Sequence, residues 1–198
     1  PRMPTLSGLR RRGFEPAAIM DFLQRAGVAK ANSLVDYELL EYCVRSRLGG
    51  TATRRIAVLN PLKLTITNYP DGKVEYFTLP NNPEDPAAGT REVAFTNTLY
   101  VERDDFMENP PGKFFRLKPG GEVRLMGAYL VTCNEVVKDE AGNVTELRCT
   151  CDLETRNNMP ADGRKVRGTI HWLSAAHALD GKVRAYDKLF TIPNINDI

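Results

Sequence analysis

The chain has 198 residues and a formal net charge of +2 at pH 7, with 42% hydrophobic and 26% charged residues. This length allows one or two domains with a substantial buried core, and the composition is ordinary for a soluble globular chain. No apolar run approaches the ~20 residues that a membrane-spanning helix needs and no signal peptide is visible, which argues against a membrane protein.

The first part of the chain has the periodicity of helices. A short helix is expected from Thr5 to Arg12. A second helix should begin at Pro16, whose ring suits a first helical position, and should end at Gly27, a plausible cap. A third apolar stripe of helical spacing follows and is expected to end at Gly49-Gly50. Residues 1–52 are therefore predicted to form a small helical subdomain.

The apolar pattern then changes to the period of strands, and Asp71-Gly72 is a hairpin signal. Short strands are expected at 56–59, 62–67, 74–79, 93–101, 123–137, 144–152, 167–173 and 183–190. Because no helix is expected between them, the sequence predicts a mainly β fold with an N-terminal α subdomain, in which the strands form an antiparallel barrel or sandwich.

Patterns typical of catalytic and metal sites are not found. The chain has only two histidines, and Cys149 and Cys151 would point to one face of a strand as packing residues, unlike the C-x-x-C loop of a zinc site. It has neither a G-x-x-x-x-G-K-[ST] loop nor a G-x-S-x-G nucleophile elbow. We therefore expect no catalytic residue and no metal site. The four cysteines do not suggest a disulfide scaffold, so we expect a reduced, cytoplasmic protein.

Arginines are the best candidates for binding. Residues 1–55 carry ten Lys or Arg and five Asp or Glu, which hints at an anionic partner. Arg54 lies where the helices give way to strands, while Arg116 and Arg124 flank a Pro-Gly-Gly turn and could project from the same rim. Guanidinium groups bind phosphates and base edges and stack on splayed bases. For each arginine alone, an ion pair with a nearby carboxylate is the alternative.

Two stretches carry a family resemblance, PRMPTLSGLRRRG at the start and ADGRKVRGTIHWLSAAHA at 161–178. The first is similar to the segment after the KMSKS-type loop of class I glutaminyl-tRNA synthetases, and the second resembles the anticodon-binding region of that family. Since the chain begins at Pro1 without an initiator Met, we expect a C-terminal piece of a synthetase.

For the fold, the resemblance implies a helical subdomain at 1–52 and an antiparallel β-barrel at 53–198. This proximal barrel is of the anticodon-binding type that is also found in a ribosomal protein, and the start of a truncated distal barrel follows it. The closing FTIPNINDI would then be a frayed end.

For function, the resemblance implies tRNA anticodon recognition within a glutamine–tRNA ligase, whose whole chain attaches glutamine to tRNA(Gln) using ATP with Mg. The fragment itself would need no cofactor and be inactive alone, because the catalytic domain is missing from it. The implied partner is tRNA(Gln), with no DNA, no membrane and a monomeric parent. The alternatives are the same part of a eukaryotic or archaeal-type glutamyl-tRNA synthetase, or a non-catalytic barrel module for protein–protein contact.

The resemblance also implies roles for single residues. Arg54 would contact anticodon bases at the helix–barrel junction, Arg116 the third anticodon base and Arg124 the first. Where the family often has E-V-R-L-R, this chain has Met126 in the last position. The first base should therefore receive fewer hydrogen bonds from this strand or be contacted by residues elsewhere. Weaker candidates for contacts with the tRNA backbone are Arg10, Arg11, Arg12 and Lys30.

Overall fold

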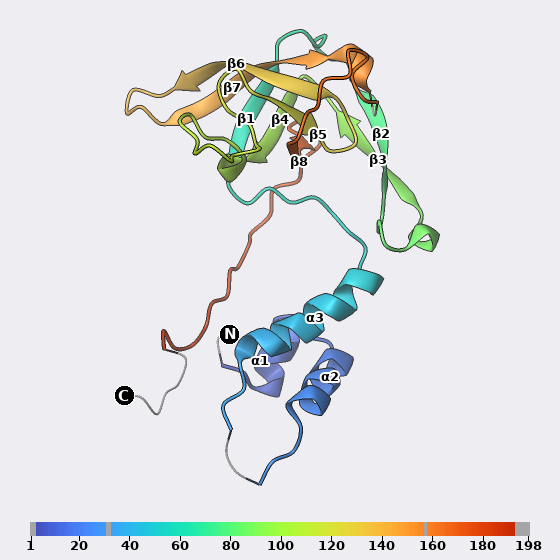
Figure 1. Ribbon diagram of the computed structural model, residues 1–198, viewed down its shortest axis with the longest axis vertical. Helices are drawn as coiled ribbons and strands as arrows, with labels where there is room; N and C mark the ends of the chain where they lie inside the picture. The colour runs from blue at the N-terminus through green and yellow to red at the C-terminus, as the bar shows by residue number, and fades with distance from the viewer. Residues whose placement is uncertain (1–2, 31–32, 157, 193–198) are drawn as a thin grey trace. The chain divides into compact units, whose positions relative to one another are not determined.

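A computed structural model of the chain describes residues 3–30, 33–156 and 158–192 (Figure 1). The chain divides into two compact units. The helical unit consists of Pro1–Thr53, Asn82–Ala88 and Lys182–Ile198, and the sheet unit consists of Arg54–Asn81 and Gly89–Gly181. The helical unit thus takes in two segments that are separated from it in sequence by strands.

The α-helices of the described residues all lie in the helical unit, and they are α1 (Leu6–Arg11), α2 (Pro16–Ala26) and α3 (Tyr37–Thr51). Thr5 caps α1, because its hydroxyl oxygen accepts a hydrogen bond from the Gly8 N–H at 3.1 Å. As predicted, Pro16 begins α2 and Gly27 caps it with a φ of 73°.

The sequence predicted that α3 ends at Gly49-Gly50, and the helix ends one residue later, at Thr51. Glycine is a poor helix former, so a contact outside the helix has to offset its low propensity. The buried side chain of Asn82 supplies one, donating a hydrogen bond to the Gly49 carbonyl at 3.2 Å. This bond also joins the 82–88 loop to the helical unit.

Seven strands of the sheet unit form one curled sheet, in the order β8-β5-β6-β7-β1-β4-β9. Their bounds are β1 (Pro61–Ile66), β4 (Thr98–Glu102), β5 (Glu122–Leu125), β6 (Leu130–Lys138), β7 (Val144–Asp152), β8 (Thr169–Ile170) and β9 (Leu173–Ser174). The strands β2 (Glu75–Pro80) and β3 (Thr90–Phe95) pair as a separate antiparallel ribbon. The β1–β7 and β5–β8 pairs are parallel, so the prediction of a purely antiparallel sheet is wrong.

The connection between the two edge strands explains why the sheet curls. Only His171 and Trp172 separate β8 from β9, which lie at opposite edges of the sheet. Three residue steps span at most about 11 Å, so the two edges must approach each other. Figure 1 shows the sheet wrapped around its interior as a partial barrel.

The core of the sheet unit fills that interior and contains the only tryptophan of the chain. Trp172 is fully buried, and its ring centroid lies 5.1 Å from that of Phe95 and 6.3 Å from that of Phe77. Its Nε1–H donates a hydrogen bond to the Met126 carbonyl at 3.0 Å. The segment that links the edges is therefore anchored inside the curl.

Two predicted strands are absent. Residues 56–59 form no strand, and the Leu59 and Asn60 N–H groups donate to the carboxylate of Glu102 at 2.6 and 3.1 Å. Residues 183–190 are exposed, lie in the helical unit and form no strand. The last six residues of FTIPNINDI lie outside the described part of the chain.

The hairpin predicted at Asp71-Gly72 is also wrong. A turn does form there, with Gly72 at a φ of 72°. However, β1 before the turn pairs with β4 and β7, whereas β2 after it pairs only with β3. The turn chemistry thus predicted the change of direction but not the strand partners.

Candidate nucleic-acid interface

The predicted site residue Arg124 lies on the outer face of the curled sheet, at the edge formed by β5 and β8. Val123 and Leu125 of β5 are buried in the core. Because side chains alternate along a strand, Arg124 belongs to the opposite, outer face, and Met126 follows in the turn after β5. Thr169 of β8 pairs with Arg124 and is exposed, whereas Arg124 is half-buried.

A close backbone approach brings the loop that carries Arg116 to this same edge. The Arg124 N–H donates to the Gly168 carbonyl at 2.8 Å. A Cβ atom on Gly168 would stand only 2.2 Å from the carbonyl oxygen of Phe115 and 3.0 Å from Cγ1 of Val123. The absence of a side chain at Gly168 therefore lets the 112–117 loop pack against the β5–β8 edge.

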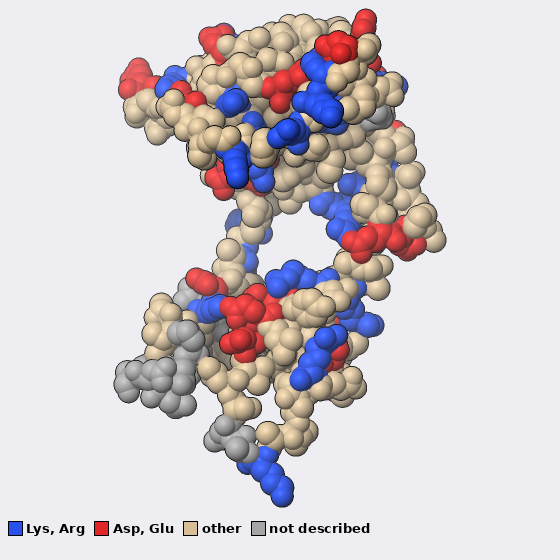
Figure 2. Space-filling view, viewed as in Figure 1, with Lys and Arg blue, Asp and Glu red and all other residues tan. Residues whose placement is uncertain are grey.

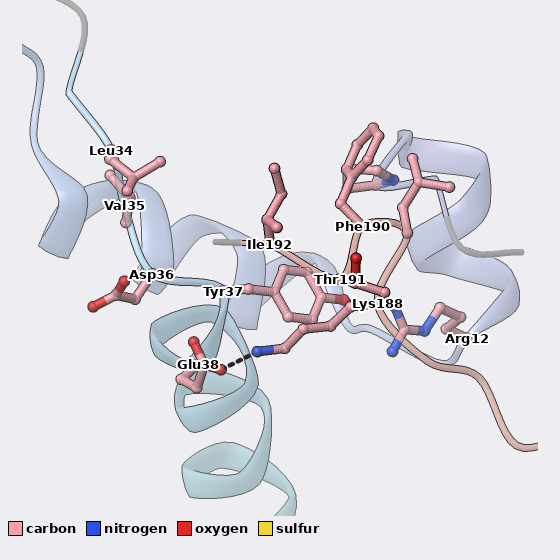
Figure 3. A pocket seen from close by; sticks show the side chains of 12 residues that line it. Arg12, Leu34, Val35, Asp36, Tyr37, Glu38, Lys188, Phe190, Thr191 and Ile192 are labelled. Carbon is pink, nitrogen blue, oxygen red and sulfur yellow. Dashed lines mark hydrogen bonds and ion pairs between the residues drawn. The ribbon is translucent and has the colours of Figure 1, made fainter. Parts of the chain in front are cut away.

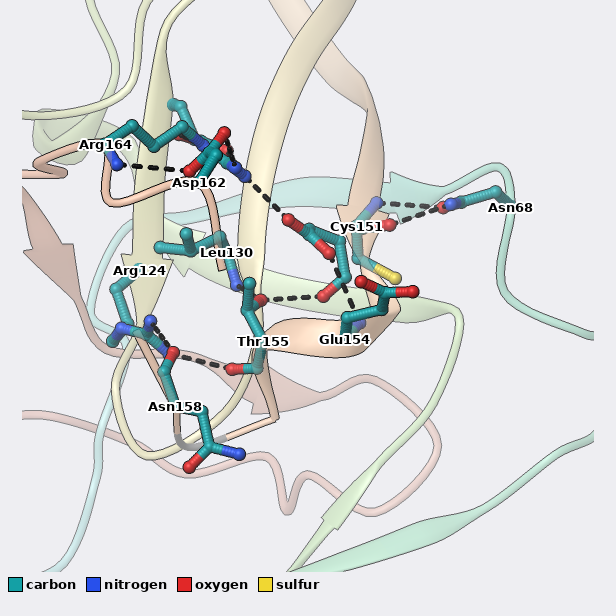
Figure 4. A network of polar contacts seen from close by, with 11 residues as sticks. Asn68, Arg124, Leu130, Cys151, Glu154, Thr155, Asn158, Asp162 and Arg164 are labelled. Carbon is teal, nitrogen blue, oxygen red and sulfur yellow. Dashed lines mark hydrogen bonds and ion pairs between the residues drawn. The ribbon is translucent and has the colours of Figure 1, made fainter. Parts of the chain in front are cut away.

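The guanidinium of Arg124 is held by three backbone carbonyls, and Figure 4 shows it beside Thr155 and Asn158. Nη1 donates to Ala128 at 2.9 Å and to Thr155 at 3.1 Å, and Nη2 donates to Asn158 at 2.6 Å. A guanidinium has five N–H donors, so among the described residues these bonds leave Nε–H and one Nη2–H without a protein acceptor. Arg124 thus ties the 155–158 segment to the turn after β5.

Arg116 is held by a buried carboxylate. Its Nη1 forms an ion pair with Asp105, which is only 2% exposed, while the Arg116 side chain remains 54% exposed. Around this pair, the Leu117 N–H donates to the Asp105 carbonyl at 3.0 Å and the Met107 N–H donates to the Leu117 carbonyl at 3.1 Å. The buried charge therefore orients the guanidinium and leaves more than half of the side chain open to solvent.

Arg54 lies on the segment that enters the sheet unit. Its N–H donates to the Asn81 carbonyl at 2.8 Å, and its own carbonyl accepts from Nη1 of Arg55 at 2.9 Å. Arg55 Nη1 also reaches Asn81 Oδ1 at 3.4 Å. Arg54 is exposed and belongs to this junction, whereas Arg116 and Arg124 lie at the β5–β8 edge.

Of the candidates in the helical unit, Arg12 has well-defined partners. Its Nη1 donates to the Tyr37 hydroxyl at 2.6 Å, and its guanidinium carbon lies 5.2 to 5.9 Å from the ring centroids of Phe14, Tyr37 and Tyr186. These contacts join α1 to α3 and to the 182–192 segment. The side chains of Arg10, Arg11 and Lys30 are exposed.

Arg12 also lines a pocket of about 540 Å³ in the helical unit (Figure 3). Apolar side chains from 34–35 and 189–192 make up much of its wall, and Lys188 forms an ion pair with Glu38 beside it. Figure 3 shows the side chains of Glu38 and Lys188 pointing toward each other at the pocket.

Sequence reasoning missed an ion cluster centred on Arg164. Its guanidinium binds both carboxylate oxygens of Glu122 at 3.0 and 2.9 Å, Asp152 at 2.6 Å and Asp162 at 2.7 Å. The hydrogen bonds that Arg164 donates to Glu122, Asp152 and Asp162 raise its pKa further above the usual value. The cluster links β5, β7 and the loop before β8. Within it, Arg164 neutralises the charge of Glu122.

A second missed pair is Phe115 and Arg167. The guanidinium carbon of Arg167 lies 5.5 Å from the centroid of the Phe115 ring. The two residues are far apart in sequence, and the only local signal for them is the basic run GRKVR, which does not indicate Phe115 as a neighbour.

Positive charge dominates the segments that meet at this edge. Residues 112–126 and 163–171 together contain seven Lys or Arg and one carboxylate, Glu122. Asp105, Asp152 and Asp162 from neighbouring segments pair with Arg116 and Arg164 and offset part of this charge. Figure 2 shows Lys and Arg side chains gathered on the visible face of the sheet unit, with Asp and Glu between them. The edge therefore has a surplus of cations.

The described residues show no metal centre and no membrane helix. No group of three or more His, Cys, Asp or Glu among them could hold a metal ion. The four cysteines are buried and unpaired, and burial raises the pKa of Cys151 to about 11. No helix in the part of the chain that the structure describes is long and apolar enough to cross a membrane.

Comparison with known proteins identifies the family. Residues 52–152 match the family of class I tRNA synthetases (E and Q), anti-codon binding domain. The chain is 57% identical over 194 residues to a glutamine–tRNA ligase of Bradyrhizobium diazoefficiens, with 98% of this chain and 35% of that protein covered. It is 56% identical over 189 residues to a glutamine–tRNA ligase of Clostridium perfringens, with 96% and 34% covered.

The chain therefore spans about a third of the length of the curated relatives it matches. The matched region covers half of the chain and includes Arg54, Arg116 and Arg124. This chain thus belongs to the class I tRNA synthetase family for glutamate and glutamine, within its anticodon-binding domain.

Proposed function

We propose that this chain is the anticodon-recognition part of a glutamine–tRNA ligase, whose whole protein attaches glutamine to tRNA(Gln) using ATP. The main support for the proposal is that Arg116 and Arg124 lie together at the β5–β8 edge and that both belong to the region that matches the family. The relatives named above are glutamine–tRNA ligases, which favours glutamine over glutamate as the amino acid of the whole protein. A module for protein–protein contact is less favoured, because the edge carries a surplus of cations.

Arg54, Arg116 and Arg124 are the proposed contacts to the anticodon. Unstacked bases expose both an edge and a face, which a guanidinium can bind by hydrogen bonds or by stacking. Asp105 would hold Arg116 ready for the third base. Arg124 would meet the first base with Nε–H and its remaining Nη2–H. In the helical unit, Arg10, Arg11 and Lys30 are candidates for phosphate contacts, and Arg12 is a weaker one because of its protein partners.

The sheet unit would correspond to the proximal anticodon-binding barrel. ATP and Mg would be bound by the rest of the whole protein, since this chain spans about a third of the length of the relatives named above. We propose that the whole protein is a cytoplasmic monomer with tRNA(Gln) as its partner.

Titration of the chain with tRNA(Gln) and with an anticodon-swapped tRNA over a salt series tests the proposal. We expect cognate binding that is weak, selective and steeply weaker at higher salt, because phosphate contacts release counterions. Aminoacylation by the chain alone should be undetectable. Absence of binding at low salt, or equal affinity for both tRNAs, would overturn the proposal.

A further inference from the structure

Phe115 is an exposed aromatic residue on a firmly anchored loop. Its side chain is 52% exposed. The loop on either side of it is fixed: the Phe114 N–H donates to the Pro111 carbonyl at 3.1 Å, and the next residue, Arg116, is paired with the buried Asp105. The backbone of Phe115 itself packs against Gly168. The ring is thus displayed to solvent by a rigid backbone, so little entropy would be lost when a ligand binds it.

Arg167 presents a second planar group next to this ring. It directly precedes Gly168, the residue on which the Phe115 carbonyl rests, and its guanidinium carbon lies 5.5 Å from the Phe115 centroid. The side chain is exposed. A phenyl ring and a guanidinium therefore lie together on the outer face of the β5–β8 edge, next to Arg116.

We propose that Phe115 and Arg167 form a platform on which one unpaired base of the anticodon loop stacks. This inference rests on the proposed function and adds to it a contact that recognises the face of a base instead of its edge. Aromatic rings and guanidinium planes both stack on splayed bases, and such stacking tolerates different bases because each has a π-face. The platform would hold a loop base in place while neighbouring arginines bind base edges.

The surrounding charge favours RNA over a protein partner. The two segments that meet here carry a cation surplus, and the one carboxylate in them is bound by Arg164. A polyanion whose bases can be splayed matches a patch that combines an aromatic ring with many cations. An apolar or acidic protein surface would match only one of these two features.

The test uses the whole chain and a panel of anticodon stem-loop RNAs of tRNA(Gln), each with 2-aminopurine at one loop position. Stacking quenches the fluorescence of 2-aminopurine, so binding of the wild-type chain should quench the probe at one position. Phe115→Leu should weaken binding about 5- to 100-fold, the loss that removal of one stacked base produces, and abolish this quenching. Phe115→Tyr should retain both.

A salt series separates stacking from charge. Phe115→Leu should leave the slope of log Kd against log salt unchanged, because no phosphate contact is lost. Arg167→Lys keeps the charge but loses the planar group, so it should reduce the quenching and keep the slope. Tyr76→Leu is the matched control, because Tyr76 is a 54% exposed aromatic residue on β2 outside the platform, and it should bind like the wild type.

The outcomes distinguish the two proposals. If the wild-type chain binds the stem-loop but Phe115→Leu binds equally well with the same quenching, the platform is wrong and the proposed function stands. The platform is also wrong if Tyr76→Leu loses as much affinity as Phe115→Leu, and the proposed function again stands. If the wild-type chain fails to bind the stem-loop or tRNA(Gln) at low salt, both proposals fall.

Discussion

Gly168 packs directly against the carbonyl of Phe115, so closely that a Cβ atom on Gly168 would stand 2.2 Å from that oxygen. The neighbour is backbone and not the end of a flexible side chain, so the loop itself would have to move. This contact is the point at which the two segments that carry Arg116 and Arg167 meet. Its disruption should therefore affect both stability and RNA binding.

Gly168→Ala is expected to lower the free energy of unfolding of the sheet unit by about 1–3 kcal/mol, the usual cost of overpacking. Urea unfolding followed by the fluorescence of Trp172 measures this, since that residue is the only tryptophan and lies in the core of the unit. Gly112→Ala is the matched control on the same loop, because a Cβ atom there would meet nothing within 4 Å. Equal effects of the two substitutions would contradict the argument.

Arg124→Lys is expected to lower the free energy of unfolding by about 1–2 kcal/mol. A lysine ammonium keeps the charge but cannot match the planar fork that reaches Ala128, Thr155 and Asn158, and hydrogen bonds to charged groups are among the stronger ones. Arg148→Lys is a suitable control, since the Arg148–Glu135 pair is exposed and such pairs contribute little.

The same variant tests whether Arg124 reads a base. If it does, Arg124→Lys should also reduce the preference for tRNA(Gln) over an anticodon-swapped tRNA, by about 1–3 kcal/mol. Titrations at a temperature where the variant stays folded separate this effect from stability. An equal loss of affinity for the two tRNAs would assign Arg124 a structural role alone.

Glu75 should make the stability of the sheet unit depend on pH in the acid range. Its carboxylate accepts hydrogen bonds from the Tyr69 and Tyr129 hydroxyls, each at 2.9 Å, and pairs with Arg156. Burial raises the pKa of Glu75, but the hydrogen bonds from Tyr129 and Tyr69 and the charges of Arg156 and Lys73 together outweigh it, and the pKa lies below its usual value. Burial and the hydrogen bond to Glu75 raise the pKa of Tyr129 to about 12.

A carboxyl group with a lowered pKa in the folded state stabilises the fold above its unfolded pKa. The stabilisation is lost as the pH falls through the folded value. Glu75→Gln should therefore cost about 1–2 kcal/mol at pH 7, and the difference from the wild type should shrink below about pH 4.5. Urea unfolding at several pH values measures this, and parallel pH profiles of the two proteins would refute it.

Local signals predicted the helical unit better than the sheet. The start of α2 at Pro16 and its end at Gly27 depend on backbone preferences within one turn of helix, so they could be inferred from neighbouring residues. The hairpin between β6 and β7 likewise has a local cause, since the Asp139 carboxylate accepts from the N–H groups of Ala141 and Asn143. Such features need no knowledge of distant contacts.

Strand partners depend on contacts between residues far apart in sequence, which the pattern of single strands does not reveal. Lys63 of β1 pairs in parallel with Glu146 of β7. The turn at Asp71-Gly72 predicted instead that the strand before it would pair with the strand directly after it. The site shows the same limit. Residue type and the family resemblance together named Arg116 and Arg124 as candidates, but the buried Asp105 and the three carbonyl partners become apparent only in the fold.

The last prediction concerns Met126, which stands where the family pattern E-V-R-L-R has its second arginine. Met126 is 37% exposed, and its backbone is fixed at both ends, since its N–H donates to Ile170 at 2.9 Å and its carbonyl accepts from Trp172 at 3.0 Å. A longer polar side chain can therefore extend into solvent without disturbing the turn. Met126 lies in the turn after β5, two residues beyond Arg124, the proposed contact of the first anticodon base.

Met126→Arg is therefore expected to tighten binding of tRNA(Gln) by about 1–3 kcal/mol if the added fork reaches a base edge, with little effect on stability. Met126→Lys controls for charge alone: it should steepen the salt dependence by about one unit without improving the discrimination against an anticodon-swapped tRNA. Titration of both variants with both tRNAs over a salt series gives the comparison. If Met126→Arg and Met126→Lys gain equally, the side chain at this position contacts phosphate, and the first base is bound by Arg124 without help from its neighbour.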